Sequence, residues 1–142
     1  MTKHILLAVD LTHEKDTRAL LAEAGRIADL EEATLSVVTV LPDYGSSFVG
    51  SFFKDGTLKE ASAKAIETLH RLAEEVLPDR EQVQCIVEVG TAYEKVLHAA
   101  ETIDATLILV GAHKPNFAGR IIGPNAARVV RHASVSVLVL RL

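Results

Sequence analysis

Residues 110–130 read VGAHKPNFAGRIIGPNAARVV. This stretch joins an apolar run that ends at Gly111 to a helix that opens near Gly123 and Pro124, through a polar loop with a further glycine. Glycines let the backbone approach a ligand, and the first free N–H groups of a helix carry partial positive charge. A strand, a glycine-containing loop and a helix N-terminus in this order predict an anion site. The alternative is an ordinary strand-to-helix connection whose glycines serve turns.

Short apolar runs alternate along the chain with segments whose apolar residues recur every three or four positions. The runs predict strands at residues 4–9, 33–41, 83–89, 105–110 and 134–142. The helical spacing predicts helices at about 14–30, 58–76, 93–103 and 123–133. This alternation predicts one α/β domain over residues 1–142, with a parallel sheet and helices on both of its faces.

Ligands of such sheets bind at the carboxyl ends of the strands, where the strand order reverses. Asp10 directly follows the first expected strand, and Gly111 follows the fourth. If these two strands are neighbours across the reversal, Asp10 and the glycine loop face one crevice.

Composition and charge narrow the class of protein. The chain has 142 residues, 49% of them hydrophobic, no tryptophan and a formal net charge of −4. A net acidic chain gives no support for nonspecific nucleic-acid binding, and no apolar run reaches the length of a membrane span.

The N-terminus is typical of a first strand and not of a signal peptide. The single cysteine, Cys85, fits a reducing cytoplasm, and we expect it to be buried in the core.

The sequence contains none of the common catalytic motifs. It has no Gly-x-Ser-x-Gly elbow, no His-Glu-x-x-His helix, no GxxxxGK[ST] loop and no GxGxxG fingerprint after the first strand. Its six histidines are scattered, without a short His/Cys ligand pairing. We therefore expect neither an enzyme nor a metal centre, although a slow ATPase activity stays open.

Three segments together resemble the universal stress protein family over essentially the whole chain. They are AVD (8–10), VEVGTAYEKVL (87–97) and the long C-terminal piece from residue 110 to residue 142. The resemblance implies a five-stranded sheet of order 3-2-1-4-5. It also implies ATP binding, with Mg²⁺, at the switch point between the first and fourth strands, and dimerisation through the last strand.

The phosphate loop departs from the pattern Gly-x2-Gly-x9-Gly-Ser/Thr that ATP-binding members carry. Gly111 matches the first glycine, but Lys114 stands where the second would be, and eight residues instead of nine precede Gly123. Pro124 replaces the Ser/Thr. The His113-Lys114-Pro115 loop looks like a shorter branch of the family, with a basic residue and proline in this place.

The resemblance also assigns candidate nucleotide-binding residues. Asp10 would lie near the ribose or the metal-linked phosphates, and Val40 would pair its backbone with adenine. The candidates for the phosphates are Gly111, His113, Lys114, Gly123 and Asn125. Two residues keep alternatives: Asp10 caps the first helix or closes a turn with Thr12, and Lys114 is an ordinary exposed lysine.

Two functional interpretations follow from these features. The first is a cytoplasmic stress-response protein that binds adenine nucleotide weakly, as a regulatory ligand. The second is an interaction module of the same fold that binds no nucleotide and acts as a homodimer through the strand Val135–Leu140. Pro124 separates the two, since proline offers neither a hydroxyl nor an N–H to a phosphate.

Residues 42–57, which include Phe48, Phe52 and Phe53, form either a lid over the site or a loop that packs its aromatics.

Overall fold

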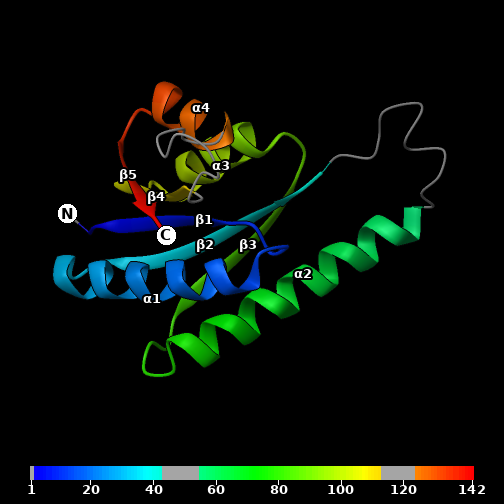
Figure 1. Ribbon diagram of the computed structural model, residues 1–142, viewed down its shortest axis with the longest axis horizontal. Helices are drawn as coiled ribbons and strands as arrows, with labels where there is room; N and C mark the ends of the chain where they lie inside the picture. Colours follow the sequence, from blue (N-terminus) through cyan, green and yellow to red (C-terminus); the bar gives the residue numbers. More distant parts are fainter. Residues whose placement is uncertain (1, 43–54, 113–123) are drawn as a thin grey trace.

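The computed structural model describes residues 2–42, 55–112 and 124–142, with the backbone alone for residues 55–57. Strands and helices alternate throughout (Figure 1). The elements are β1 (His4–Val9), α1 (Glu14–Glu31), β2 (Thr34–Leu41), α2 (Asp55–Val76), β3 (Val83–Val89), α3 (Ala92–Thr102), β4 (Leu107–Ala112), α4 (Pro124–His132) and β5 (Ser136–Arg141). The expected order of elements is confirmed, and most boundaries differ by one to three residues.

The five strands form one parallel sheet of order β3-β2-β1-β4-β5, which confirms the predicted topology. The central strand β1 pairs with β2 along one edge and with β4 along the other. The strand order therefore reverses at β1, and the carboxyl ends of β1 and β4 lie side by side. This is the place where open α/β sheets bind their ligands.

Helices cover both faces of the sheet, α1 and α2 on one face and α3 and α4 on the other (Figure 1). Successive side chains of a strand point to opposite faces. In β1, Ile5 and Leu7 pack in the core on the side of α1 and α2, while Leu6 packs in the core on the side of α3 and α4. All three are at most 1% exposed, which explains why the run HILLAV has no polar face.

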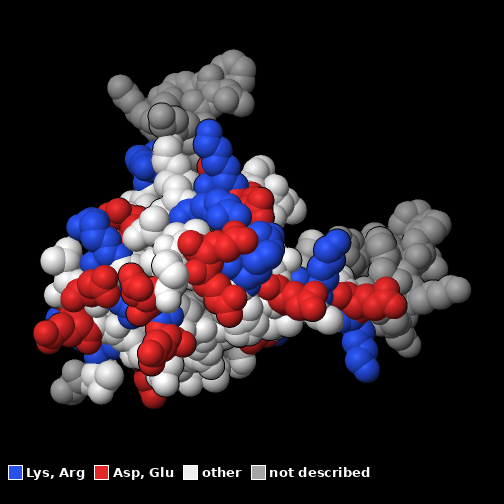
Figure 2. Space-filling view, turned by 90° about the horizontal axis from the view of Figure 1, so that it is seen from below, with Lys and Arg blue, Asp and Glu red and all other residues white. Residues whose placement is uncertain are grey.

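The outer surface of α1 and α2 mixes positive and negative side chains (Figure 2). Several of them pair between the two helices: Arg71 donates to Glu14 at 2.9 Å, and Arg18 pairs with Glu75. On this face the charges alternate in sign and form no extended basic area. Among the helices of the described residues, none combines the length and the apolar character that crossing a bilayer requires.

Two residues are less buried than expected. Val130, one of the apolar residues whose spacing predicts the helix at 123–133, is 44% exposed, because this short helix buries only Ala126 and Val129. Cys85 is half-buried, since β3 is an edge strand of the sheet. Burial still raises the pKa of the Cys85 thiol to about 11, so the thiol is protonated at neutral pH. The alternatives of a lid or a packed loop at residues 42–57 concern mainly residues 43–54. These lie outside the described residues.

Candidate functional site

A cavity of about 540 Å³ lies at the carboxyl ends of β1, β2 and β4, at the point where the strand order reverses. Its walls come from the ends of these strands and from the first turns of α1, α3 and α4. Volumes of this size suit small organic ligands and cofactors. Four of the predicted site residues line this one cavity: Asp10, Val40, Gly111 and Asn125.

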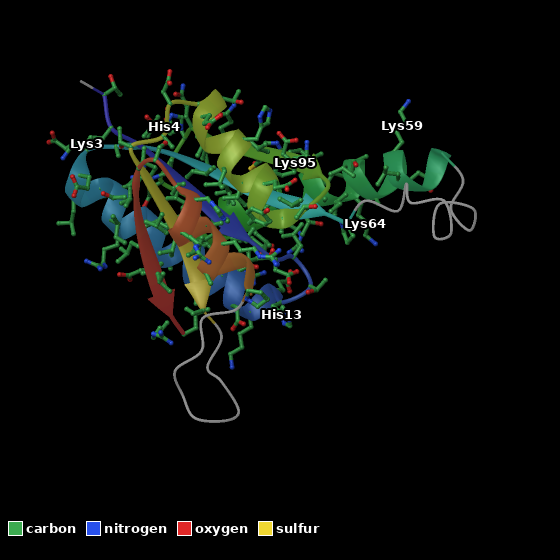
Figure 3. All side chains as sticks on the ribbon, turned by 90° about the horizontal axis from the view of Figure 1, so that it is seen from above. Lys3, His4, His13, Lys59, Lys64 and Lys95 are labelled. Atoms are coloured by element: carbon green, nitrogen blue, oxygen red, sulfur yellow. The ribbon has the colours of Figure 1, made fainter. Side chains whose placement is uncertain are left out.

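Asp10 closes a turn at the end of β1. Its Oδ1 accepts hydrogen bonds from the backbone N–H of Thr12, at 2.9 Å, and from the Thr12 hydroxyl, at 2.7 Å. The second carboxylate oxygen of Asp10 lies 3.9 Å from Nε2 of His13. Figure 3 places His13 at the carboxyl end of the sheet. His13 is the N-cap of α1 and makes no side-chain cap bond, so the turn alternative for Asp10 is confirmed and the capping alternative is wrong.

Two buried hydroxyls of the cavity wall bond to the backbone around Asp10. The Thr17 hydroxyl lies 3.0 Å from the carbonyl oxygens of Asp10 and His13, and the Thr39 hydroxyl donates to the carbonyl of Val9 at 3.0 Å. No buried side-chain nitrogen or oxygen lacks a partner in the described parts of the chain. These threonines therefore shape the turn after β1 and hold Asp10 in position.

Val40 extends past the end of β1. The Thr34 N–H donates to the Lys3 carbonyl, so alternate residues of β2 direct their backbone groups toward β1. Val40 belongs to this set, but the register between the two strands ends at Val9 and Thr39. Val40 therefore lies beyond the paired part of β1, and it lines the cavity.

Gly111 was expected in a loop, but it is a strand residue, because β4 continues through it to Ala112. It pairs with Leu140 of β5, and this pairing extends the strand beyond Val110. A Cβ atom at Gly111 would lie 2.9 Å from Cδ1 and 3.1 Å from Cδ2 of the buried Leu20 on α1. A side chain at this position would therefore force Leu20 of α1 to shift.

We expect Gly111→Ala to destabilise the fold by about 1–3 kcal/mol, because the added methyl group forces the Leu20 side chain out of its present position. In a Leu20→Ala background the added methyl group meets open space, and its cost should largely vanish. Urea unfolding of the two single variants and the double variant measures this coupling. Equal costs of Gly111→Ala in both backgrounds would show that Leu20 is not the reason for the glycine.

The first turn of α4 forms the cavity wall opposite α1, and both Pro124 and Asn125 are exposed there. Arg131 and His132 lie in the last turn of the helix, where a positive charge interacts favourably with the helix dipole. The other predicted site residues, His113, Lys114 and Gly123, lie outside the described residues.

Polar side chains at the opposite, amino end of the sheet bond to one another. Nδ1 of His4 lies 3.1 Å from the Ile103 carbonyl oxygen, and Nε2 lies 2.7 Å from the Ser36 hydroxyl, which donates to Oε1 of Gln84 at 3.0 Å. Figure 3 places His4 and His13 at opposite ends of the sheet. Within the described ranges, no group of three or more His, Cys, Asp or Glu residues is arranged to hold a metal ion.

The contribution of α3 to the cavity was not predicted from the sequence. Ala92, Tyr93 and Val96 line the cavity from the first turns of this helix. Only one feature of the sequence indicates this contribution: these residues follow the third strand and Gly90. The helix that starts there begins at the same edge of the sheet as α1 and α4.

Comparisons with known proteins agree with this geometry. The model of the universal stress protein family matches residues 1–141. Universal stress protein G of Salmonella typhimurium is 27% identical over 143 residues, which cover 99% of this chain and 100% of that protein. The solved structure of the hypothetical protein MJ0577 has a TM-score of 0.78 at 20% identity and covers 100% of this chain and 97% of that chain. A universal stress protein solved in complex with cAMP has a TM-score of 0.70 at 19% identity, over 97% of this chain and 96% of that chain. The solved structures show the same fold. Because the family model spans nearly every residue, the chain belongs to the universal stress protein family.

Proposed function

We propose that this protein binds an adenine nucleotide as a regulatory ligand in a stress response. The observation that carries the proposal is the cavity at the switch point, where Asp10, Val40, Gly111 and Asn125 meet. A structural neighbour with the same fold is a universal stress protein in complex with cAMP, which supports a nucleotide as the ligand class.

The polar groups of the cavity suggest how each part of the ligand is held. Val40 offers a backbone carbonyl to the base, and the first turn of α4 is placed for the phosphates. Asp10 and Asp16 add two carboxylates to the wall. A triphosphate beside carboxylates is favoured when Mg²⁺ neutralises part of its charge, whereas a cyclic monophosphate carries a single charge and needs less compensation.

We propose that the protein binds the nucleotide without hydrolysing it. The hydroxyls of Thr12 and Thr17 in the wall donate to Asp10, and the hydroxyl of Thr39 donates to the carbonyl of Val9, the last residue of β1. They serve to position Asp10, and the carboxylate of Asp10 itself is engaged by Thr12. We therefore expect no phosphate release above the buffer rate when MgATP is incubated with the protein.

Equilibrium dialysis with MgATP, cAMP and adenosine tests the binding proposal directly. We expect dissociation constants in the high micromolar range or weaker for MgATP, since Pro124 offers no donor to a phosphate. Inorganic tripolyphosphate is the control for binding through charge alone, and it should bind more weakly than MgATP. Absence of binding of all three adenine compounds at millimolar concentration would contradict the proposal.

A homodimer through the strand Val135–Leu140 is the second proposed property. In the described sheet, β5 pairs with β4 along one edge, and no strand pairs with its other edge. Leu138 on this strand is 41% exposed, and Val130 on the neighbouring α4 is 44% exposed. An open strand edge beside exposed apolar side chains favours pairing with a second copy.

We expect Leu138→Lys to convert a dimer into a monomer at micromolar concentration, because the lysine places a charge in the apolar part of this surface. Leu30→Lys is the matched control: Leu30 lies on α1 and is 72% exposed, so the same change there should leave the dimer intact. Sedimentation velocity measures both variants and the unmodified protein. A monomeric unmodified protein, or a dimer that survives Leu138→Lys, would rule out this interface.

A further inference from the structure

Tyr93 is the one phenylalanine, tyrosine or tryptophan in the described parts of the chain, and it lines the cavity. It lies in the first turn of α3, which begins at Ala92. The other cavity residues of this helix, Ala92 and Val96, are small and aliphatic. Tyr93 therefore gives this side of the cavity its aromatic surface.

The ring of Tyr93 is held from α4 and from its own helix. The guanidinium carbon of Arg128 lies 5.2 Å from the ring centroid, in a cation–π contact. The His132 ring stacks on it with centroids 5.9 Å apart and planes inclined by 30°. The phenolic O–H donates to Oε1 of Glu94 at 3.3 Å. A side chain with two rotatable bonds and three contacts keeps one position before a ligand arrives.

These contacts also join two walls of the cavity. Arg128 and His132 belong to α4, and the first turn of the same helix lines the cavity at Pro124 and Asn125. α4 buries only two side chains, so its packing against the sheet is limited. The contacts of Tyr93 with Arg128 and His132 thus help to fix α4 relative to α3.

We propose that Tyr93 is the side chain that contacts the base of the bound ligand, and that Arg128 is a positioning residue for its ring. This inference rests on the nucleotide-binding function proposed above and adds the residue that selects a planar base. Aromatic rings contact the π-systems of bases favourably, whereas they gain little from a sugar phosphate. The site should therefore prefer adenosine to ribose 5-phosphate.

Tyrosine ring signals test the contact in the intact protein. Tyr44 is the only other tyrosine and there is no tryptophan, so Tyr44→Phe leaves the Tyr93 ring as the single tyrosine signal. With ¹³C-labelled tyrosine, adenosine should shift the ring signals of Tyr93 with the same concentration dependence as the amide signal of Val40. Ribose 5-phosphate at the same concentrations should leave the ring signals in place.

Four variants separate contact from positioning, with adenosine affinity as the readout. Tyr93→Leu should weaken binding about tenfold, and Tyr93→Phe, which keeps the ring, less than about twofold. Arg128→Gln should weaken it about two- to fivefold. Arg131→Gln removes the same charge from an exposed position of the same helix and should change nothing. Cooperative thermal unfolding of each variant confirms that it folds.

Each outcome decides the inference. Adenosine that shifts the Val40 amide but not the Tyr93 ring, or binds Tyr93→Leu as tightly as the unmodified protein, overturns the role of Tyr93 and leaves nucleotide binding standing. Adenosine that shifts neither signal overturns the proposed function and this inference together. Equal losses in Arg128→Gln and Arg131→Gln would show a general charge effect and remove Arg128 as a positioning residue.

Discussion

Pro124→Ser is expected to tighten MgATP binding by about two decades. Pro124 is the first residue of α4 and lines the cavity, but it has no N–H and no hydroxyl. Serine supplies both, and each hydrogen bond to a charged group contributes about 1.5 kcal/mol or more. Two such bonds at 1.4 kcal/mol per decade give the expected gain. Titration calorimetry with MgATP measures it.

Two comparisons identify the source of this gain. Pro124→Ala restores the N–H alone and should recover about half of the effect on a logarithmic scale. Adenosine has no phosphate, so its affinity should be the same in all three proteins. A serine variant that binds MgATP no better than the unmodified protein would show that the phosphates are held by other groups. So would tight binding by the unmodified protein.

Leu7→Ala is expected to cost about 2–5 kcal/mol of unfolding free energy. Leu7 is completely buried in the central strand, where β2 and β4 flank it and the core on the side of α1 and α2 encloses its side chain. The truncation leaves a cavity that the paired strands cannot collapse to fill. Urea unfolding followed by circular dichroism measures the loss.

Leu30→Ala is the matched control for this core substitution. The same atoms are removed, but Leu30 is 72% exposed at the end of α1, and surface changes of this kind stay within about 0.5 kcal/mol. Similar losses in both variants would contradict the assignment of Leu7 to the core.

Much of the fold could be predicted from the sequence, because its signals are local. The almost wholly apolar run at residues 4–9 requires cover on both faces and so identifies a central strand. The regular alternation of strands and helical stripes then leaves a parallel sheet as the natural arrangement. The placement of Asp10 beside the end of β4 followed from the strand order, which the family resemblance supplied.

The remaining features depend on contacts between distant segments. Gly111 lies inside β4 because β5 pairs with it, and a side chain there would meet Leu20 on α1. Val130 faces solvent because α4 is short and buries only two side chains. The place of Tyr93 at the cavity wall depends on how α4 packs against α3, which no pattern within either helix reveals.

Amide chemical-shift mapping with MgATP decides whether the cavity at the switch point holds the nucleotide. We expect saturable shifts for residues 8–12, for Val40 and its neighbours, and for residues 110–112, all at the carboxyl ends of β1, β2 and β4. Amides of residues 65–76 on α2, away from the cavity, should stay in place. Shifts confined to α2 or to the amino ends of the strands, or no shift at millimolar MgATP, would contradict the account.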